Sequence, residues 1–409
     1  MVRTVLVSGA SIAGPAVAYW LSRQGFRVVV VEQAPALRPG GQTVDLRGAG
    51  RTVIERMGLL DEARAAAVDE RGAAWVDERG RRVVRLPVEL LGGEGLVAEI
   101  EVLRGDLARL LHTATRDDVE YVFGDRVVGL VEHDGGVDVR FAHGAPRTVD
   151  LVVGADGAHS GVRALAFGGG APGPAGLREP GVRDLGGYTA WFSAPPPREF
   201  DGWFLLHNAR GGRVATLRPV QPGASAMAGL TVTAPPQGLE RCGRAAQQRL
   251  LADAFADVGW EVPRLLEAMV EAPDFAFDRV TQVRTDRWAA GRTILVGDAG
   301  YAPSFLTGLG TSLALVGAYV LAAELAAAGG DHQVAAARYT ATMRPYVAQA
   351  QQLPPGGLAG FAPPTRGRIA VRDLVMRAST RPPFRALMAR QAARADAVTL
   401  PDHRPVPVG

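Results

Sequence analysis

The sequence predicts an α/β protein in which a Rossmann-like parallel sheet with a β-meander is joined to an antiparallel-sheet domain and a C-terminal helical region. Three observations lead to this fold class. The chain opens with a strand, a glycine-rich turn, a helix and a second strand; short strands recur from 187 to 233; and the chain beyond 330 is helical and rich in arginine. The opening order is that of the βαβ unit that binds dinucleotides.

The glycine turn at 9–14 reads G-A-S-I-A-G and follows a β-branched run. Gly9 permits a tight turn and Gly14 lets the helix pack close to the strand, while Ser11 stands where the backbone approaches a pyrophosphate. The second strand ends at Glu32, whose carboxylate can accept hydrogen bonds from both hydroxyls of an adenosine ribose. The alternative is an ordinary βα turn with a solvated glutamate.

The middle of the chain predicts a meander that leads back into the parallel sheet. Short apolar runs alternate with turns from 121 to 154, and HDGG at 133–136 indicates a hairpin. In DLVVGADGAHSGVR at 150–163, a buried strand gives way to a turn and a helix start. The Gly- and Pro-rich stretch at 168–181 is expected to be a linker or loop.

Later segments return the chain to its first domain. Short strands between 187 and 233 indicate antiparallel sheet, and helices are expected at about 240–256 and 261–270. The buried strand RTILVG at 292–297 then resumes the first sheet. We therefore predict discontinuous domains, which are a cofactor domain at 1–70, 100–175 and 285–330, a substrate domain at 71–99 and 176–284, and a helical region at 331–409.

Composition limits the classes of function. The 409 residues are 47% hydrophobic and 21% charged, which is typical of an ordered globular protein. All 45 basic residues are arginine, but 42 acidic residues are interspersed and the net charge is +3, so no nucleic-acid surface is expected. The single cysteine, Cys242, excludes an internal disulfide and fits a reducing cytoplasm. No secretory signal, nucleophile triad or metal cluster stands out.

The apolar run at 313–325 is either a membrane span or the wall of a cofactor site. It holds one charge, Glu324, and its uncharged part is shorter than the roughly 20 residues that a bilayer requires. Gly308 and Gly310 precede it, and they would let the backbone lie against a flat ring at the positive end of the helix. We favour a buried helix that begins at a cofactor. Docking of the arginine-rich C-terminal part on anionic lipid is a weaker alternative, because acidic residues are interspersed there.

The motifs GASIAG, GADGAHSGVR and GDAGYAPSFLTGLGTS resemble, in order and spacing, the three signatures of class A flavoprotein aromatic hydroxylases, the para-hydroxybenzoate hydroxylase family. The resemblance extends to about residue 350. VDLRG at 44–48 and VLRGDLARLL at 102–111 also look like flavin-contacting elements. The closer likeness is to bacterial monooxygenases of polyketide-type and polycyclic aromatic compounds, including tetracycline-modifying ones. It implies FAD bound in an extended form, with NADPH or NADH as a transient reductant.

The resemblance also implies which residues bind the cofactor. Asp298 would accept hydrogen bonds from ribityl hydroxyls, and free N–H groups at the start of the apolar helix would stabilise the reduced flavin. Asp156 and Arg163 would position the pyrophosphate and NAD(P)H, the alternative being an Asp-Gly turn stapled by a local arginine. The expected cofactor-binding residues are Gly9, Ser11, Ile12, Ala13, Gly14, Glu32, Gln33, Asp45, Arg47, Arg104, Asp156, Asp298, Gly308, Leu309, Gly310 and Thr311.

One loop departs from the family pattern. Family members commonly have His where Tyr301 stands, a second Pro where Phe305 stands, Gln at Leu309 and Asn at Ser312. We expect all four changes to border the front edge of the flavin, where Leu309 removes a side-chain hydrogen bond and Phe305 adds bulk.

The resemblance implies a monooxygenase in which NAD(P)H reduces FAD, dioxygen adds at flavin C4a, and the hydroperoxide transfers oxygen to an electron-rich carbon of a polycyclic aromatic or polyketide-type substrate. The protein would be a cytoplasmic monomer or homodimer without stable membrane insertion. Alternatives are a Baeyer–Villiger or epoxidising oxygenase, and a flavoprotein that sequesters an aromatic metabolite. No catalytic residue is assigned. The substrate pocket is expected near Trp191, Phe192, Trp203, Phe204, His207 and Phe305, with some of the strand aromatics expected to be core instead.

Overall fold

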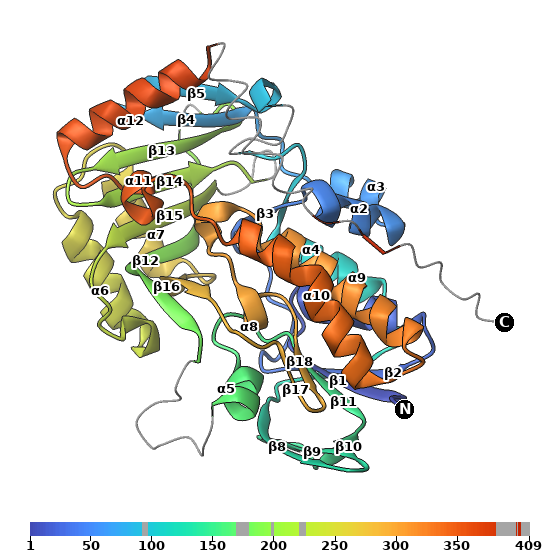
Figure 1. The fold of residues 1–409 in the computed structure, drawn as a ribbon. Helices are drawn as coiled ribbons and strands as arrows, with labels where there is room; N and C mark the ends of the chain where they lie inside the picture. The colour runs from blue at the N-terminus through green and yellow to red at the C-terminus, as the bar shows by residue number, and fades with distance from the viewer. Residues whose placement is uncertain are drawn as a thin grey trace.

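The computed structural model describes residues 1–91, 97–168, 180–197, 200–220 and 226–381, together with residues 398, 400 and 401. Figure 1 shows two sheets in different parts of the molecule, with the N-terminus beside the parallel sheet and helix α12 (Arg366–Ser379) across the strands at the far edge of the other sheet. This mixed arrangement confirms the predicted fold class.

The parallel sheet has the strand order β17-β18-β11-β1-β2-β7. Its central strands are runs of buried aliphatic residues, as expected for a parallel sheet that is covered on both faces. Strand β17 pairs antiparallel with β18, whereas β18, β11, β1, β2 and β7 pair parallel with one another in that order. The bounds are β1 Thr4–Ser8, β2 Arg27–Glu32, β7 Glu120–Phe123, β11 Leu151–Gly154, β17 Ala289–Ala290 and β18 Thr293–Leu295.

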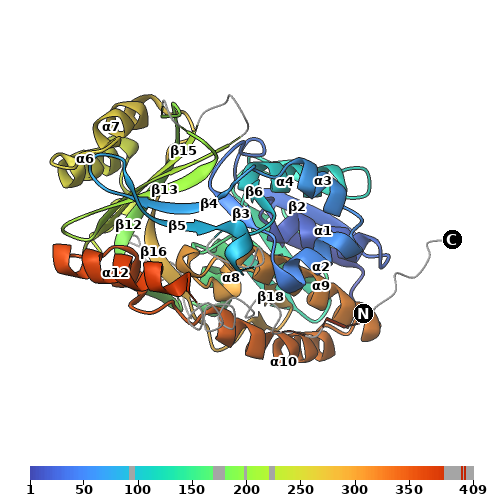
Figure 2. The same cartoon turned by 90° about the horizontal axis from the view of Figure 1, so that it is seen from above.

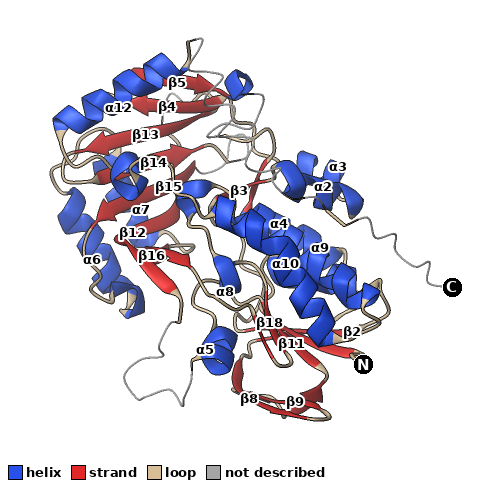
Figure 3. Ribbon diagram, viewed as in Figure 1, coloured by secondary structure: helices blue, strands red, loops and turns tan. Residues whose placement is uncertain are grey.

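Helices α1 (Ala13–Ser22) and α9 (Gly310–Ala327) pack against each other beside this sheet, and α10 (His332–Ala350) packs on α9 (Figure 3). In the described part of the chain, α9 is the helix long and apolar enough to cross a membrane, with a mean hydropathy of 1.5. However, 78% of its 18-residue window is buried inside the protein. It therefore has the environment of a core helix.

The predicted meander is a three-stranded sheet of β8 (Val127–His133), β9 (Gly136–Phe141) and β10 (Arg147–Val149). Val127, Val137, Val139 and Val149 of this sheet join the core of the parallel sheet. The remaining elements of this half are α2 Gly48–Arg56, α3 Leu60–Ala65, α4 Arg104–Thr113, α5 Gly161–Phe167, α8 Asp298–Tyr301, the paired strands β3 Thr43–Asp45 and β6 Glu101–Leu103, and a 3-10 turn at Phe305–Thr307.

The second sheet has seven strands in the order β16-β12-β15-β14-β13-β4-β5. It is mainly antiparallel, but β4 runs parallel to β13, which the sequence did not predict. The first two strands of the sheet along the chain, β4 and β5, are separated from the others by the return to the parallel sheet. The bounds are β4 Gly72–Val76, β5 Arg82–Pro87, β12 Val182–Ala194, β13 Trp203–Ala209, β14 Arg213–Arg218, β15 Ala226–Thr233 and β16 Ala276–Val283.

The two faces of the seven-stranded sheet have different neighbours. Helices α6 (Arg244–Phe255) and α7 (Val262–Glu271) cover one face with an apolar core, which we call the helix face. Figure 2 shows α12 on the other side of the sheet, together with the parallel-sheet half of the molecule. We call this second side the cofactor face. Because side chains alternate along a strand, neighbouring residues of one strand lie on different faces.

The predicted C-terminal helical region divides between the two halves. Helix α10 contributes Tyr339, Met343 and Tyr346 to the core of the parallel sheet. Helix α11 (Gly357–Phe361) packs beside β12, and α12 packs on β5. Residues 382–397, 399 and 402–409 of this region, and 169–179 of the predicted linker, lie outside the described residues.

Candidate cofactor site

The glycine turn after β1 is held by close backbone contacts. Gly9 has φ +106°, and a Cβ there would lie 2.5 Å from the Ala155 carbonyl oxygen. A Cβ on Gly14 would lie 1.8 Å from the Gly9 carbonyl oxygen. Both positions therefore require glycine. Ile12 and Ala13 are buried at the start of α1.

Glu32 lies at the carboxyl end of β2, beside this turn. Its carboxylate accepts hydrogen bonds from the backbone N–H groups of Ala10 (2.8 Å) and Ala34 (2.9 Å). These bonds fix the acid at the edge of the sheet where α/β proteins bind nucleotides. From this position the Glu32 carboxylate could accept hydrogen bonds from the hydroxyls of an adenosine ribose.

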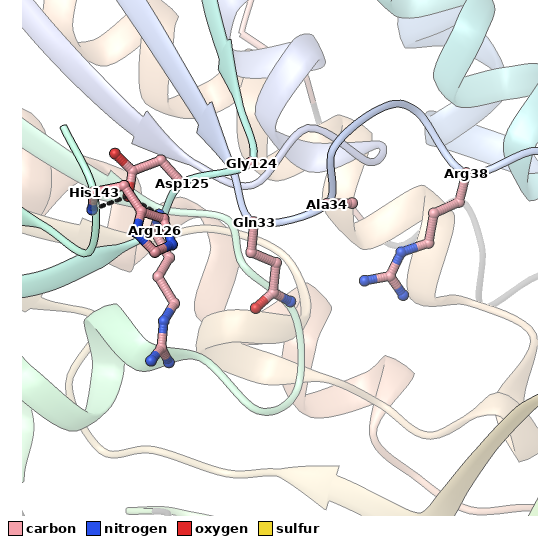
Figure 4. Close-up of a pocket in the computed structure, with 7 residues that line it drawn as sticks. All are labelled: Gln33, Ala34, Arg38, Gly124, Asp125, Arg126 and His143. Atoms are coloured by element: carbon pink, nitrogen blue, oxygen red, sulfur yellow. Dashed lines mark hydrogen bonds between the residues drawn. The ribbon is translucent and has the colours of Figure 1, made fainter. Parts of the chain in front are cut away.

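A pocket of about 410 Å³ follows Glu32 at the carboxyl ends of β2 and β7 (Figure 4). Of its residues the sequence predicted Gln33, but not Arg38 or Arg126, because nothing in the sequence reveals that the ends of β2 and β7 are adjacent. The pocket is of suitable size and position for the adenosine end of FAD. It is lined by Gln33, Ala34, Arg38, Gly124, Asp125, Arg126 and His143.

Arg104 and Asp298 continue the site from the turn, and we call the partly enclosed surface that they form with Ser11 the groove. Arg104 Nε donates to Ser11 Oγ at 3.1 Å, and the charge of Asp298 acts on Arg104. The side chains of Arg104 and Asp298 are exposed to solvent, but the surrounding protein still desolvates them. Residues that line a groove have this combination of exposure and desolvation. Desolvation by this surrounding raises the pKa of Asp298, and Arg104 opposes the shift.

Asp156 and Arg163 hold two loops of the groove together. The Asp156 carboxylate accepts hydrogen bonds from the Ser160 hydroxyl and from Val162 N (3.1 Å) at the start of α5. The guanidinium of the fully buried Arg163 donates to the carbonyls of Ala158 (2.6 Å) and Ala299 (2.7 Å). These contacts staple the turn after β11, and Arg163 also fixes the loop that carries Asp298.

The loop before α9 meets the β3 region. Gly308 has φ +66°, and a Cβ there would lie 2.8 Å from Asp45 Oδ2. Asp45 is paired with Arg47, at 2.7 Å between Oδ2 and Nη2. A Cβ on Gly310 would lie 3.7 Å from Asp298 Oδ1, so this loop also approaches the groove.

The first turn of α9 has no side-chain cap. Its first N–H groups therefore remain able to bind an anionic group. Leu309 and Thr311 beside them are largely buried.

Two of the four departures from the family pattern are fully buried. Tyr301 is fully buried, and its hydroxyl is 2.7 Å from that of Tyr339, which donates to the Leu295 carbonyl. Ser312 is also buried, and its hydroxyl donates to the Arg47 carbonyl at 3.2 Å. The expectation that all four border the flavin is therefore wrong for Tyr301, which points into the core because α9 leaves room for it at Gly317.

Phe305 joins the cofactor loop to the seven-stranded sheet. Its ring centroid lies 6.0 Å from that of Trp191 on β12 and 5.8 Å from that of Phe361 on α11, both edge to face. Gly229 on β15 makes room for Trp191, since a Cβ there would lie 2.7 Å from the indole ring. Phe305 is 36% exposed, so this aromatic group reaches the surface of the cofactor face.

Three of the predicted pocket residues lie on the helix face instead. Phe192 and Trp203 pack in the core beneath α6 and α7. The buried His207 lies 5.7 Å from Trp260 between ring centroids, and its Nδ1 is 3.1 Å from the Val76 carbonyl oxygen. Phe204 points to the cofactor face with Leu206. The structure therefore brings Trp191 and Phe305 together and separates them from Trp203 and His207.

These features define a flavoprotein site, and the similarity to known proteins agrees. Residues 3–353 match the FAD-binding domain family. An uncharacterized protein of Mycobacterium tuberculosis is 42% identical over 88% of this chain and 95% of its own length. A flavin-dependent monooxygenase from an unknown prokaryotic organism is 37% identical over 84% of this chain and 86% of its own. The crystal structure of the tetracycline destructase Tet(51) has a TM-score of 0.81 at 30% identity, covering 98% of this chain and all of that one.

The chain therefore belongs to the FAD-dependent monooxygenases with a para-hydroxybenzoate hydroxylase-type FAD-binding domain. The residues present fit FAD. Gly9 and Gly14 permit the tight turn, Glu32 and the adjoining pocket provide for the adenosine, Arg104 and Asp298 line the continuing groove, and α9 offers an uncapped N-terminus.

Proposed function

We propose that the protein is an NAD(P)H-dependent FAD monooxygenase that inserts one atom of dioxygen into a polycyclic aromatic or polyketide-type molecule. The Trp191–Phe305 contact carries this proposal, because it places an aromatic surface on the loop that leads into the uncapped end of α9. Bound FAD would supply the redox chemistry by accepting a hydride and activating dioxygen. The oxygen-transfer route that the family resemblance implies is part of the proposal.

The chain's own residues would position the cofactor and exclude water. Glu32 would hold the ribose, and Arg104 with Asp298 would hold the middle of the cofactor along the groove. The N-terminus of α9 would stabilise negative charge on the flavin through its backbone N–H groups. Because Asp45 pairs with Arg47 beside Gly308, these two residues are proposed to border the ring.

The substrate would stack on the aromatic surface of the cofactor face. Trp191, Phe305 and Phe361 offer flat apolar rings, and Phe305 keeps one part in solvent. Large ring systems suit such a surface better than small polar molecules. The tetracycline destructases among the similar structures act on a polycyclic compound according to their name, which supports this substrate class. We further propose the predicted domain boundaries and a cytoplasmic location.

The test is oxidation of NADPH and of NADH by the purified FAD-loaded protein, with and without a panel of polycyclic phenols and tetracyclines. Hydrogen peroxide and product mass are followed together. A substrate-stimulated rate with a product heavier by one oxygen atom supports the proposal, and product structure then separates hydroxylation from Baeyer–Villiger or epoxide chemistry. Tight ligand binding without stimulation, with all reductant recovered as peroxide, would instead indicate the sequestering flavoprotein.

A matched pair of variants on α4 tests the cofactor groove. Arg104→Gln should weaken FAD affinity by about tenfold or more, because one charge-assisted contact is worth about 1.5–3 kcal/mol. Arg109→Gln lies on the same helix but pairs at the surface with Asp106, so FAD affinity should stay unchanged. Equal FAD affinities for the two variants would show that Arg104 does not contact the cofactor.

A further inference from the structure

A buried group of charged side chains lies where β14 of the seven-stranded sheet meets the β3–β6 pair. Arg218 Nε is 3.0 Å from Glu70 Oε1, and Arg218 Nη1 is 2.5 Å from Glu101 Oε2. The same Nη1 donates to the Thr43 hydroxyl. The guanidinium also lies over the ring of Phe204, 4.1 Å from its centroid. Arg218 thus connects the two halves of the molecule through two carboxylates.

Both carboxyl groups are shielded from water. The side chains of Glu70 and Glu101 are 2% and 1% exposed. Glu101 accepts a further hydrogen bond from Ala98 N at 2.9 Å. The Glu70 oxygens accept no hydrogen bond from the described residues, although Oε1 faces Arg218. Glu70 is therefore a buried acid with unused capacity to bind a proton.

The group also contains a like-charge pair. Asp45 on β3 stands directly opposite Glu101 on β6, and its own partner is Arg47. Among the described residues, three carboxylates thus face two guanidinium groups, for a net charge of −1 if every group is ionised. The sequence neighbours Asp69, Arg71 and Glu99 are exposed and do not balance this charge. One bound proton would make the group neutral, and a buried unbalanced charge is costly.

We propose that Glu70 and Glu101 form a proton-binding pair, which holds one proton between its two carboxyl groups and supplies it at the junction of the substrate sheet and the cofactor loop. The site itself depends only on the described contacts. The use of its proton rests on the proposed function. A monooxygenase that oxidises one NAD(P)H takes up one proton for each water that it releases. When the pair donates, one carboxyl O–H bond breaks and the proton goes to the oxygen atom that leaves as water. A carboxylate then remains paired with Arg218, and a proton from solvent restores the acid.

The titration of these groups agrees with their geometry. Burial raises the pKa of Glu70 to about 7, with Arg218 opposing the shift and Asp45 adding to it. Burial also raises the pKa of Glu101 well above its ordinary value, against the same arginine. Because acids that interact strongly titrate as a unit, the two glutamates form a single proton-binding site.

The experiment is infrared spectroscopy of the FAD-loaded protein from about pH 5 to about pH 9, a range that extends to both sides of the pKa of about 7 at Glu70. A neutral carboxyl group has a carbonyl band that the carboxylate lacks. The wild type should show this band at low pH and lose it near neutrality. Glu70→Gln and Glu101→Gln should each remove this band, because the remaining acid is then the only carboxyl group of the pair beside Arg218 and ionises.

Two controls assign the band. Glu99→Gln changes an exposed acid that pairs with Arg51 next to the cluster, so the band should remain. Asp298→Asn removes another acid whose pKa is raised, and it should leave the Glu70–Glu101 band in place. A wild type whose pH-dependent band survives both glutamine variants would overturn the proposal. Loss of the band in only one of them would assign the proton to a single residue and overturn the shared pair.

The role in turnover has a separate readout. With an active substrate, the wild-type rate should fall as the pH rises through about 7, and Glu70→Gln should flatten this profile while FAD affinity is retained. A residue that only positioned Arg218 would lower the rate at every pH equally. Absence of any monooxygenase activity would overturn the proposed function but leave the infrared result intact. If Glu101→Gln does not fold, survival of the band in Glu70→Gln still overturns the proposal.

Discussion

Trp191 and Phe305 lie edge to face with their ring centroids 6.0 Å apart, and this contact joins the substrate sheet to the loop that begins α9. Trp203, on β13 of the same sheet, points to the opposite face. The two tryptophans are similarly half-buried, which makes them a matched pair for mutation.

Trp191→Ala should weaken binding of a polycyclic substrate by roughly tenfold, because one aromatic contact contributes about 0.5–1.5 kcal/mol beyond its buried area. Trp203→Ala should lower stability but leave ligand affinity unchanged. Fluorescence titration of the FAD-loaded variants measures both affinities, and thermal unfolding measures both stabilities. A loss of affinity in Trp203→Ala equal to that in Trp191→Ala would contradict this assignment of faces.

Tyr301→Phe should lower the free energy of unfolding by about 1 kcal/mol, the typical contribution of one buried hydrogen bond. Its hydroxyl partner Tyr339 keeps the bond to the Leu295 carbonyl, so no buried group is stranded. Tyr339→Phe should cost more, since it leaves both the Tyr301 hydroxyl and that carbonyl unpaired. Urea unfolding gives both values. A change in FAD affinity in Tyr301→Phe would indicate that Tyr301 contacts the flavin after all.

The parts of the site that are local in sequence were predictable. Gly9, Gly14 and Glu32 follow from one strand–turn–helix–strand pattern, and the uncapped start of α9 follows from its glycines. The face on which each strand side chain lies follows from alternation, and adjacent residues such as Trp191 and Phe192 must point apart. Some of the aromatics expected near the pocket therefore had to be core, but the sequence alone does not show which ones. The union of Glu70, Glu101 and Arg218 was not predictable, because it depends on the packing of segments far apart in sequence.

Ser304→Gly should stabilise the protein by about 1 kcal/mol. Ser304 has φ +80° and ψ 148°, a backbone region that is occupied almost solely by glycine and costs other residues about 1–3 kcal/mol. Its buried hydroxyl also has no hydrogen-bond partner among the described residues. The matched control is Ala302→Gly, which should destabilise the protein because φ there is −50°. Equal shifts of the urea midpoint in both variants would argue against backbone strain at Ser304.

Glu70 should make stability fall as the pH rises. Its folded-state pKa of about 7 lies above the value of the unfolded chain, so the folded protein binds more protons between about pH 4.5 and 7. The stabilising effect is complete below this window and is lost through it. The melting temperature of Glu70→Gln should therefore rise relative to the wild type across the window. Acids other than the coupled Glu101 affect both proteins alike, and a constant difference would show that Glu70 titrates normally.

The division of the parallel sheet along the chain has a consequence for biosynthesis. Strand β18, Asp298 and the turn into α9 come after every strand of the seven-stranded sheet. A ribosome therefore produces that whole sheet while β11 still lacks its partner strand β18 and α1 still lacks the packing of α9. The cofactor groove is completed only when translation has passed α9, so FAD can be captured only late, and the nascent substrate sheet must be kept from aggregating until then.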